Sequence, residues 1–324
     1  MKPVVYLALA MLLPFSVEQR HVADVVTVAL IVILFDGGRG MGLPRFRAEA
    51  VPILGLGLVG TFATAGAATV AAHLLLGVSW YLSLLLATAL APTDPAVVFS
   101  LLGEIRGRSS TVLEGESGAN DPVGIALLAA LLGAGSLSGS ALGHAAGDFG
   151  LQLAVGTAVG MAGGWLMRRL PLEFLLAFGL YWLAHAAHGS GFLAVFVAGL
   201  VAGDDVAHVI DGTIGEVVAF VGLGLLVVPS DLIRLDVWLP GLALAVLVGF
   251  VVRPLACWPF VLGLRRPERA FVLLAGLKGA VPLLLGSMLL GQQHGHRLFA
   301  VTVVVVVLSI VVQGALVPLL ARRT

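Results

Sequence analysis

The chain has 324 residues, of which 59% are hydrophobic and 11% are charged, and its mean hydropathy is +1.07. An ordinary soluble domain is roughly 25% charged, so this composition excludes a soluble globular protein and indicates an integral membrane protein. Eighteen Lys plus Arg residues balance eighteen Asp plus Glu residues, which excludes the basic surface that nucleic-acid binding requires. The single cysteine, Cys257, excludes an intrachain disulfide and a multi-cysteine metal site.

The N-terminal run MKPVVYLALAMLLPFS starts like a signal peptide, but it has no clear small-residue cleavage site before Val17. We therefore expect it to be retained as the first membrane span. A bilayer core needs about 20 apolar residues per helix, and fewer where a helix is short or broken. On that basis the sequence predicts twelve spans, at residues 3–16, 22–36, 50–76, 80–102, 111–133, 150–167, 172–187, 190–203, 214–230, 237–262, 269–290 and 297–319.

The distribution of Lys and Arg predicts the orientation of these spans. With the N-terminus inside, thirteen of the eighteen basic residues fall on the inner side, three fall on the outer side, and Arg253 and Lys278 lie within spans. This asymmetry follows the positive-inside rule and predicts that both termini are cytoplasmic. The Gly/Ser/Ala-rich segment between Gly133 and Gly150 has no Lys or Arg and is predicted to be a short outer loop.

Ionisable side chains inside the apolar spans are the first candidates for a functional site, because charge at bilayer depth is costly unless it is paired, hydrated or used. The candidates inside the predicted spans are Asp36, Asp94, Glu116, Asp121, Arg253 and Lys278. Arg253 and Lys278 are expected to pair with some of these acids. Because Asp36 is followed by Gly37 and Gly38, the residues alone leave open that it is simply a helix C-terminal residue at the interface.

Two predicted spans contain a charge beside helix-breaking residues. Span four contains APTDPA, with Thr93 and Asp94 between two prolines, and span eleven contains GLKGAVP, with Lys278 between glycines. Proline removes helical hydrogen bonds, and an unwound stretch at membrane depth is tolerated where it lines a cavity or is buried in protein. Paired broken helices in two halves of a chain indicate a secondary-transporter site near the midplane. A simple proline kink with a capping Thr/Asp pair is the alternative.

The segment ESGANDP in span five gathers oxygen-bearing side chains. Ser117 and Asp121 are four residues apart and therefore share one helix face, and Glu116 and Asn120 share a neighbouring stripe. Carboxylate, hydroxyl and backbone oxygens are the ligands that a desolvated hard cation prefers. The segment therefore predicts a site for a monovalent cation or a proton.

Seven segments resemble, in order, the signatures of the bacterial monovalent cation:proton antiporters. They are LFDGG, APTDPAVVFSLL, LEGESGANDPVGI, GSGFLAVFVAGLVAG, GLLVVPSDL, VVRPLA and GLKGAVP. More narrowly, they resemble the NhaP-like branch of sodium or potassium/proton antiporters. The resemblance implies an all-α polytopic membrane protein of about 12 helices, with an inverted-repeat fold and two crossed discontinuous helices. A core domain is then expected to move against a dimerising domain.

The resemblance also implies roles for individual residues. Asp121 matches the carboxylate that takes either the cation or the proton, and Asn120 stands where electrogenic relatives carry a second Asp. The positions that help to bind the ion are matched by Thr93, Ser117 and Asp36, with Asp94 acting nearby. Glu116 matches an acid that pairs with a base on the helix containing GLKGAVP, which is Lys278 here. Lys replaces the usual Arg at this position, and the bidentate geometry of a guanidinium is lost.

We therefore expect a single transmembrane exchanger domain, residues 1–324, in the bacterial inner membrane. It is expected to exchange Na⁺ or K⁺ for H⁺ by competition at Asp121, electroneutrally because Asn120 cannot titrate, without a cofactor and as a homodimer in the lipid bilayer. The first span matches the family's second helix, so the family's first helix and a C-terminal cytosolic regulatory domain are expected to be missing. An inactive or sensory antiporter-like protein and a passive cation channel are the alternatives. No nucleophile motif indicates an enzyme.

Overall fold

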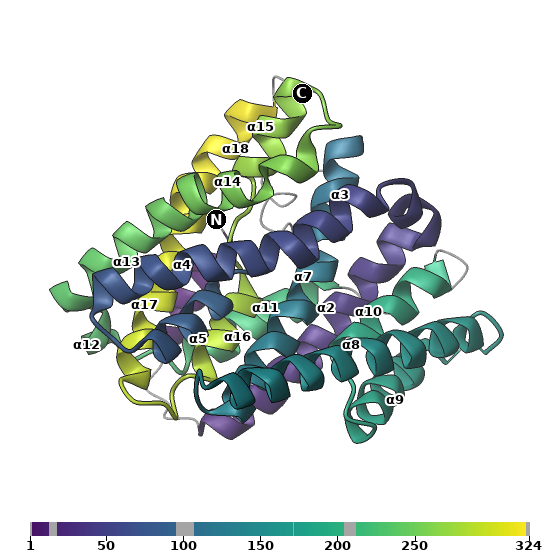
Figure 1. Ribbon diagram of the computed structural model, residues 1–324. Coiled ribbons are helices and arrows are strands. Elements are labelled where there is room, and N and C mark those ends of the chain that lie inside the picture. Colours follow the sequence, from purple (N-terminus) through teal and green to yellow (C-terminus); the bar gives the residue numbers. More distant parts are fainter. Residues whose placement is uncertain (1, 13–17, 95–106, 171, 204–211, 322–324) are drawn as a thin grey trace.

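The computed structural model describes residues 2–12, 18–94, 107–170, 172–203 and 212–321, which form helices and short connections and contain no β-strand (Figure 1). The α-helices are α1 (Lys2–Met11), α2 (Gln19–Ala48), α3 (Ala50–Leu54), α4 (Thr61–Leu76), α5 (Trp80–Leu90), α7 (Arg108–Ala134), α8 (Gly139–Met167), α9 (Glu173–Ala186), α10 (Gly191–Ala202), α11 (Gly212–Gly224), α12 (Pro229–Leu232), α13 (Leu235–Leu247), α14 (Arg253–Cys257), α15 (Arg266–Leu274), α16 (Ala280–Ser287), α17 (Gly295–Leu308) and α18 (Gly314–Ala321). In the described residues, the π-helical stretches η1 (Gly55–Gly60), η3 (Val248–Val252) and η5 (Ser309–Gln313) join consecutive helices into longer rods, and the 3₁₀ turn η4 (Trp258–Val261) extends α14 to the end of its rod.

These helices correspond to the predicted membrane spans. In the described part of the chain, six continuous helical rods are long and apolar enough to cross a membrane, and five further apolar helices are shorter. Together with the interrupted pair α15 and α16, they match the twelve predicted spans one to one. The last residues of predicted spans 3–16 and 80–102 lie outside the described residues. The predicted all-α architecture is therefore confirmed.

Two predicted boundaries are wrong. Most of the expected outer loop between Gly133 and Gly150 is helical, because α8 begins at Gly139, where the Ser138 hydroxyl accepts a hydrogen bond from the backbone N–H of Ala141. Span 22–36 also continues, since α2 runs on to Ala48 and bends at Gly42, whose φ is 65°. Glycine tolerates that positive φ, so the chain turns there without steric strain.

Small residues let α8 lie directly against α10. Gly156, Gly160 and Gly164 recur every four residues on α8, and a Cβ added at Gly160 would lie 2.5 Å from the carbonyl oxygen of Ala194. This close backbone approach is the small-xxx-small packing typical of membrane helices, which have no hydrophobic driving force between them. On its other side α10 packs against α2 (Figure 1). The helix pair α2 and α10 thereby forms one wall of the interior.

The two interrupted helices meet at their breaks. Helix α5 ends at Leu90 and α15 ends at Leu274, and the backbone N–H of Asp94 donates to the carbonyl of Leu277 at 2.7 Å. The Lys278 ammonium donates to the carbonyls of Ala91 and Pro92, each at 3.0 Å. The two predicted breaks therefore lie against each other, and the lysine satisfies carbonyls that the first break leaves without helical partners. Residues 95–102, which the prediction places after the first break, lie outside the described residues.

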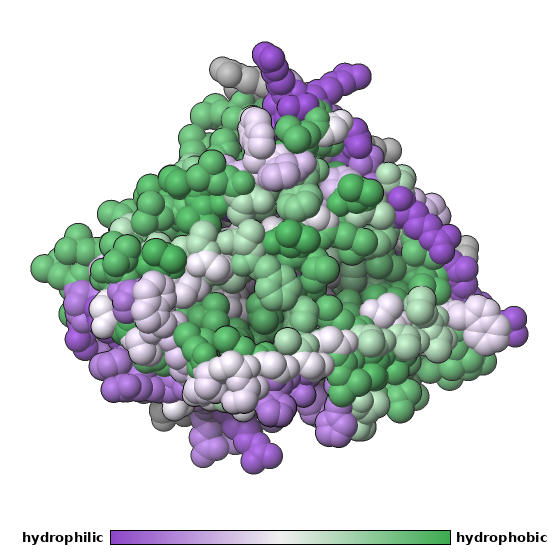
Figure 2. Space-filling view, viewed as in Figure 1, coloured by the Kyte–Doolittle hydropathy of each residue, from purple (hydrophilic) through white to green (hydrophobic). Residues whose placement is uncertain are grey.

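The outer surface suits a lipid environment. Apolar side chains cover most of the visible face, and hydrophilic residues gather toward its edges (Figure 2). Large apolar side chains such as Val51, Leu74, Leu175 and Leu255 are more than two-thirds exposed. A water-soluble monomer rarely exposes so much contiguous apolar surface, whereas hydrocarbon solvates it without cost.

We predict that Gly160→Ala destabilises the protein by about 1–3 kcal/mol, because the added methyl group overpacks the contact with Ala194. Gly150→Ala, on the same helix, is the matched control, since a Cβ there has no neighbour within 4 Å. The thermal unfolding midpoint in detergent should fall for the first variant and stay or rise for the second. Equal midpoints would contradict the close α8–α10 packing.

Candidate functional site

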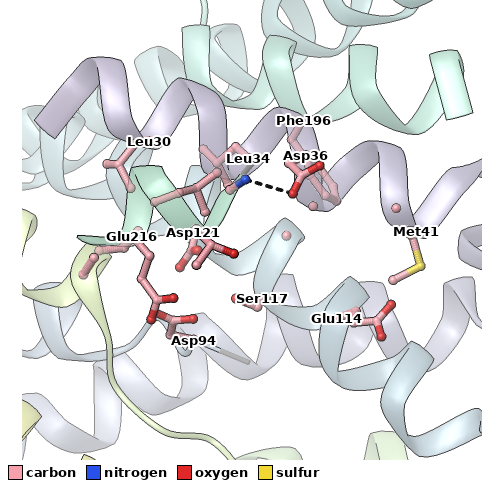
Figure 3. Close-up of a pocket in the computed structure, with 18 of the residues that line it drawn as sticks. Leu30, Leu34, Asp36, Met41, Asp94, Glu114, Ser117, Asp121, Phe196 and Glu216 are labelled. Atoms are coloured by element: carbon pink, nitrogen blue, oxygen red, sulfur yellow. Dashed lines mark hydrogen bonds between the residues drawn. The ribbon is translucent and has the colours of Figure 1, made fainter. Parts of the chain in front are cut away.

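A cavity of about 570 Å³ lies in the interior between five helices. Its wall is made by residues of α2, α7, α10, α11 and α16 together with Asp94 from the first break (Figure 3). The polar side chains in the wall are Asp36, Arg45, Asp94, Glu114, Ser117, Asp121, Thr213 and Glu216. This concentration of carboxylates inside an apolar bundle is the main chemical feature of the protein.

Helical spacing explains which residues of α7 reach the cavity. Glu114, Ser117, Gly118 and Asp121 recur at intervals of three or four residues and form one stripe along the helix. The predicted common face of Ser117 and Asp121 is therefore correct. The intervening Glu116 does not line the cavity.

Asp121 occupies the deep end of this stripe. Its side chain is only 7% exposed, and its Oδ1 atom is buried without a hydrogen-bond partner. A buried polar atom is almost always bonded, and an unsatisfied one costs about 1–3 kcal/mol, more when it is charged. One turn before it, the Ser117 hydroxyl donates to the carbonyl of Thr93 at 2.5 Å, which leaves the hydroxyl oxygen itself able to accept or to bind a cation. The site can therefore receive a proton or a cation.

Two of the expected ion ligands lie outside the cavity lining. The Asn120 amide donates to the Thr93 hydroxyl at 2.9 Å, and its carbonyl oxygen accepts from the Thr93 backbone N–H at 3.3 Å. Both residues are buried, and neither contributes to the cavity wall. In this structure they fix the first break against α7 and position the carbonyl that Ser117 contacts.

Asp36 lies at the cavity wall in the middle of α2, so the alternative of a helix C-terminal residue is wrong. Its carboxylate accepts hydrogen bonds from the Arg39 guanidinium at 2.7 Å and from the backbone N–H of Gly212 at 3.1 Å, the second of which is the dashed line in Figure 3. The second bond ties α2 to the first turn of α11. Asp36 is thus already paired, and it also sets the position of the neighbouring helix.

Glu116 pairs with Arg253, and the expected pairing with Lys278 is wrong. The guanidinium donates two hydrogen bonds to the carboxylate, at 2.6 and 3.0 Å, and both side chains are at most 3% exposed. Arg253 can make this two-point contact because its donors form a planar fork, whereas the single ammonium of Lys278 binds the carbonyls of Ala91 and Pro92.

The glycines on either side of Lys278 leave space for the side chains of Arg253 and Asp94. A Cβ at Gly276 would lie 1.9 Å from Nε of Arg253, and one at Gly279 would lie 1.8 Å from Oδ2 of Asp94. Neither position therefore tolerates a side chain without displacing a charged neighbour. Two π-helical stretches also lie in this region. Stretch η3 ends directly before Arg253, and the Ser309 hydroxyl of η5 accepts a hydrogen bond from the Lys278 backbone N–H at 3.0 Å.

Glu114 and Glu216 also line the cavity, and neither was predicted as a site residue. Both fall inside predicted spans, so the rule that an intramembrane acid marks a functional site would have found them. The helical spacing of Glu114 from Ser117 and Asp121 was a second signal. Glu114 forms a salt bridge with Arg45 at 2.9 Å, at the polar rim of the cavity. Glu216 lies deeper, on α11, and its Oε1 atom is buried without a hydrogen-bond partner.

Comparison with known proteins relates this arrangement to one family. The family described as sodium/hydrogen exchanger, transmembrane, matches residues 2–323. The K⁺/H⁺ antiporter NhaP of Alkalimonas amylolytica is 36% identical over 317 residues, which cover 89% of this chain and 55% of that protein. The K⁺/H⁺ antiporter NhaP2 of Shewanella oneidensis is 34% identical over 324 residues, covering 91% and 56%. The chain therefore spans about half the length of these two relatives.

A more distant relative and one solved structure complete the comparison. The Na⁺/H⁺ antiporter NhaH of Halobacillus dabanensis is 29% identical, with 90% of this chain and 81% of that protein covered. The structure of the sodium proton antiporter of Methanocaldococcus jannaschii at pH 8 superimposes with a TM-score of 0.81 at 20% identity, over 98% of this chain and 91% of that chain. The fold is thus that of a multi-pass antiporter.

We predict that Glu116→Gln lowers stability by about 3–5 kcal/mol, because it leaves the buried Arg253 charge without its counter-charge. Arg253→Met should be similarly harmful, and the double variant should lose less than the sum of the two single losses. Asp236→Asn is the control, because it removes exposed ion pairs with Arg234 and Arg297 and should change stability little. Thermal midpoints in detergent measure all four. A Glu116→Gln loss no larger than that of Asp236→Asn would contradict the assignment.

Proposed function

The chain belongs to the sodium/hydrogen exchanger family, and on that premise we propose that it is a secondary active antiporter that exchanges Na⁺ or K⁺ for H⁺. The family and the fold are those of transporters rather than enzymes. The observation that carries the proposal is the Asp121 carboxylate, which faces the cavity with a buried oxygen that has no partner. A proton or a cation supplies what that oxygen lacks.

Competition at Asp121 would couple the two fluxes. A bound cation and a bound proton both neutralise the same carboxylate, so only one of them is held at a time. Moving the bare charge through the membrane interior is expensive, whereas the neutralised site moves at much lower cost. Exchange then follows if the interrupted helices and α7 change their exposure only when the site is occupied.

The proposed orientation makes this an inward-facing state. Arg45 and Glu114 form the polar rim of the cavity, and Arg45 belongs to the basic residues that the positive-inside rule assigns to the cytoplasm. With both termini cytoplasmic, an ion would enter past Arg45 and Glu114 and reach Ser117 and Asp121. We assign the protein to the bacterial inner membrane, acting as a homodimer.

The same geometry supports one proton per cation. Asn120 cannot titrate, and its amide is engaged by Thr93. Asp121 is then the group whose proton is exchanged, so each cycle moves equal charge in both directions. The cation itself is Na⁺ or K⁺, and the higher identity to the two K⁺/H⁺ relatives than to the Na⁺/H⁺ relative favours K⁺ as the first cation to test.

We predict that Asp121→Asn abolishes cation/proton exchange without loss of stability, because the amide keeps the size of the side chain but cannot exchange a proton. Proton flux in everted vesicles or proteoliposomes, with each cation added in turn, measures the activity. Asp148→Asn, on the exposed surface of α8, is the matched control and should exchange like the unmodified protein. Normal rates in Asp121→Asn would overturn the assignment, and no flux with any cation in the unmodified protein would overturn the proposed function.

We also predict that exchange in proteoliposomes generates no current. The expected rate is independent of an imposed membrane potential, because one positive charge leaves for each that enters. Solid-supported-membrane recordings during cation jumps test this directly. A transport current whose sign follows the ion gradients, and which is absent in Asp121→Asn, would show a stoichiometry other than one to one.

A further inference from the structure

Glu216 is a cavity acid to which no role has yet been assigned. It lies on α11 one turn after Gly212, the residue whose backbone N–H is held by Asp36. This bond and the packing of α11 against α2 and α16 direct the stripe containing Gly212 and Glu216 toward the cavity. In Figure 3 the Glu216 carboxylate points to the same side of the cavity as that of Asp94. Glu216 therefore brings a negative charge to the first break from a helix that is remote in sequence.

Besides Asp94, four acids line the cavity, and they fall into two groups by their partners. Asp36 is paired with Arg39 at 2.7 Å, and Glu114 is paired with Arg45 at 2.9 Å. Asp121 and Glu216 differ, because each has a buried carboxylate oxygen that accepts no hydrogen bond. The structure records no salt bridge between Glu216 and a described Lys or Arg. The cavity thus contains two carboxylates whose buried oxygens the protein does not satisfy.

A purely structural role for Glu216 does not account for this arrangement. A glutamate that stabilised α11 would bond to a backbone group or to a basic side chain, as Asp36 and Glu116 do. An unsatisfied buried oxygen instead lowers stability. Two such oxygens facing one cavity are explained together if a positively charged ligand resides there.

We propose that Glu216 is a further cation-binding carboxylate of this cavity, which acts with Asp121 and Asp94 on the transported monovalent cation. This inference rests on the proposed function, because it takes the cation to be the one that is exchanged. Asp121 remains the group that exchanges the proton, and the one-to-one ratio requires that Glu216 carry the same charge in both halves of the cycle.

The ion reaches Glu216 with part of its water shell. Among the described residues, no three His, Cys, Asp or Glu side chains are close enough to hold a dehydrated metal ion. The cavity of about 570 Å³ has ample room for a hydrated cation, since one water occupies about 30 Å³ in the liquid. Glu216 then acts mainly by charge, through water, and contributes to affinity more than to the rate of the loaded carrier.

Exchange kinetics of Glu216→Gln in proteoliposomes test the proposal. The amide keeps the size of the side chain and removes its charge. We expect the apparent KM for the cation to rise about tenfold, which corresponds to about 1.4 kcal/mol of binding free energy. The maximal rate at saturating cation and the absence of current should persist. Glu216→Asp, which keeps the charge, should lie closer to the unmodified protein.

Glu173→Gln is the matched control, because Glu173, on α9 and outside the cavity wall, also has a buried carboxylate oxygen without a partner. Its KM should not change. Size-exclusion profiles in detergent show whether each variant folds, and Glu216→Met, which also removes the charge, replaces Glu216→Gln with the same expected rise in KM if the latter does not fold. An unchanged KM in Glu216→Gln, an equal rise in Glu173→Gln, or a new transport current would each overturn the inference. These outcomes require an active unmodified protein, whereas its inactivity with Na⁺, K⁺ and Li⁺ would instead refute the proposed function.

Discussion

The site depends on hydrogen bonding between the two interrupted helices. At membrane depth, backbone groups released by a broken helix have no water to bond to, so they must find partners within the protein. The Asp94 N–H bonds to the Leu277 carbonyl, and the Lys278 ammonium bonds to the carbonyls of Ala91 and Pro92. Each break therefore supplies hydrogen-bond partners for polar groups of the other. Because Asp94 is part of this contact, the same bonds that make the breaks tolerable also fix one wall of the cavity.

Helix α7 connects this crossing to the cavity by using two of its faces differently. One stripe carries Glu116 and Asn120, which bond to Arg253 and Thr93 and hold the surrounding elements in place. The other stripe carries Ser117 and Asp121 into the cavity. A rotation of α7 by one residue would turn Glu116 and Asn120 toward the cavity and turn Ser117 and Asp121 away from their present positions. The buried two-point contact between Glu116 and Arg253 opposes such a rotation, so it positions Asp121 without touching it.

The sequence predicts features that depend on residues close together in the chain. It does not predict contacts that depend on how distant helices pack. The spans, both helix breaks and the shared face of Ser117 and Asp121 follow from composition and helical spacing. The partner of Glu116 does not, because Arg253 and Lys278 are both buried bases, and only the packing of α14 and the second break decides between them. Asn120 was expected beside the ion, but its amide is held by Thr93, a residue on another element. The position of Glu216 inside a predicted span marks it as a candidate, but nothing near it in sequence relates α11 to ESGANDP, so its place at the same cavity does not follow from the sequence.

The partners of the buried acids indicate how structural and transport roles are divided. An acid that is held by an arginine, as Glu116 is, has its charge neutralised at all times and gains little from an incoming ion. A buried acid without such a partner is unstable when empty and gains the full benefit of a proton or a cation. If Asp121 is the exchange site, this difference is what enforces coupling: the empty carboxylate resists transfer through the membrane interior, and occupancy removes the resistance. The incomplete bonding of Asp121 would then be a requirement for transport rather than a defect of packing.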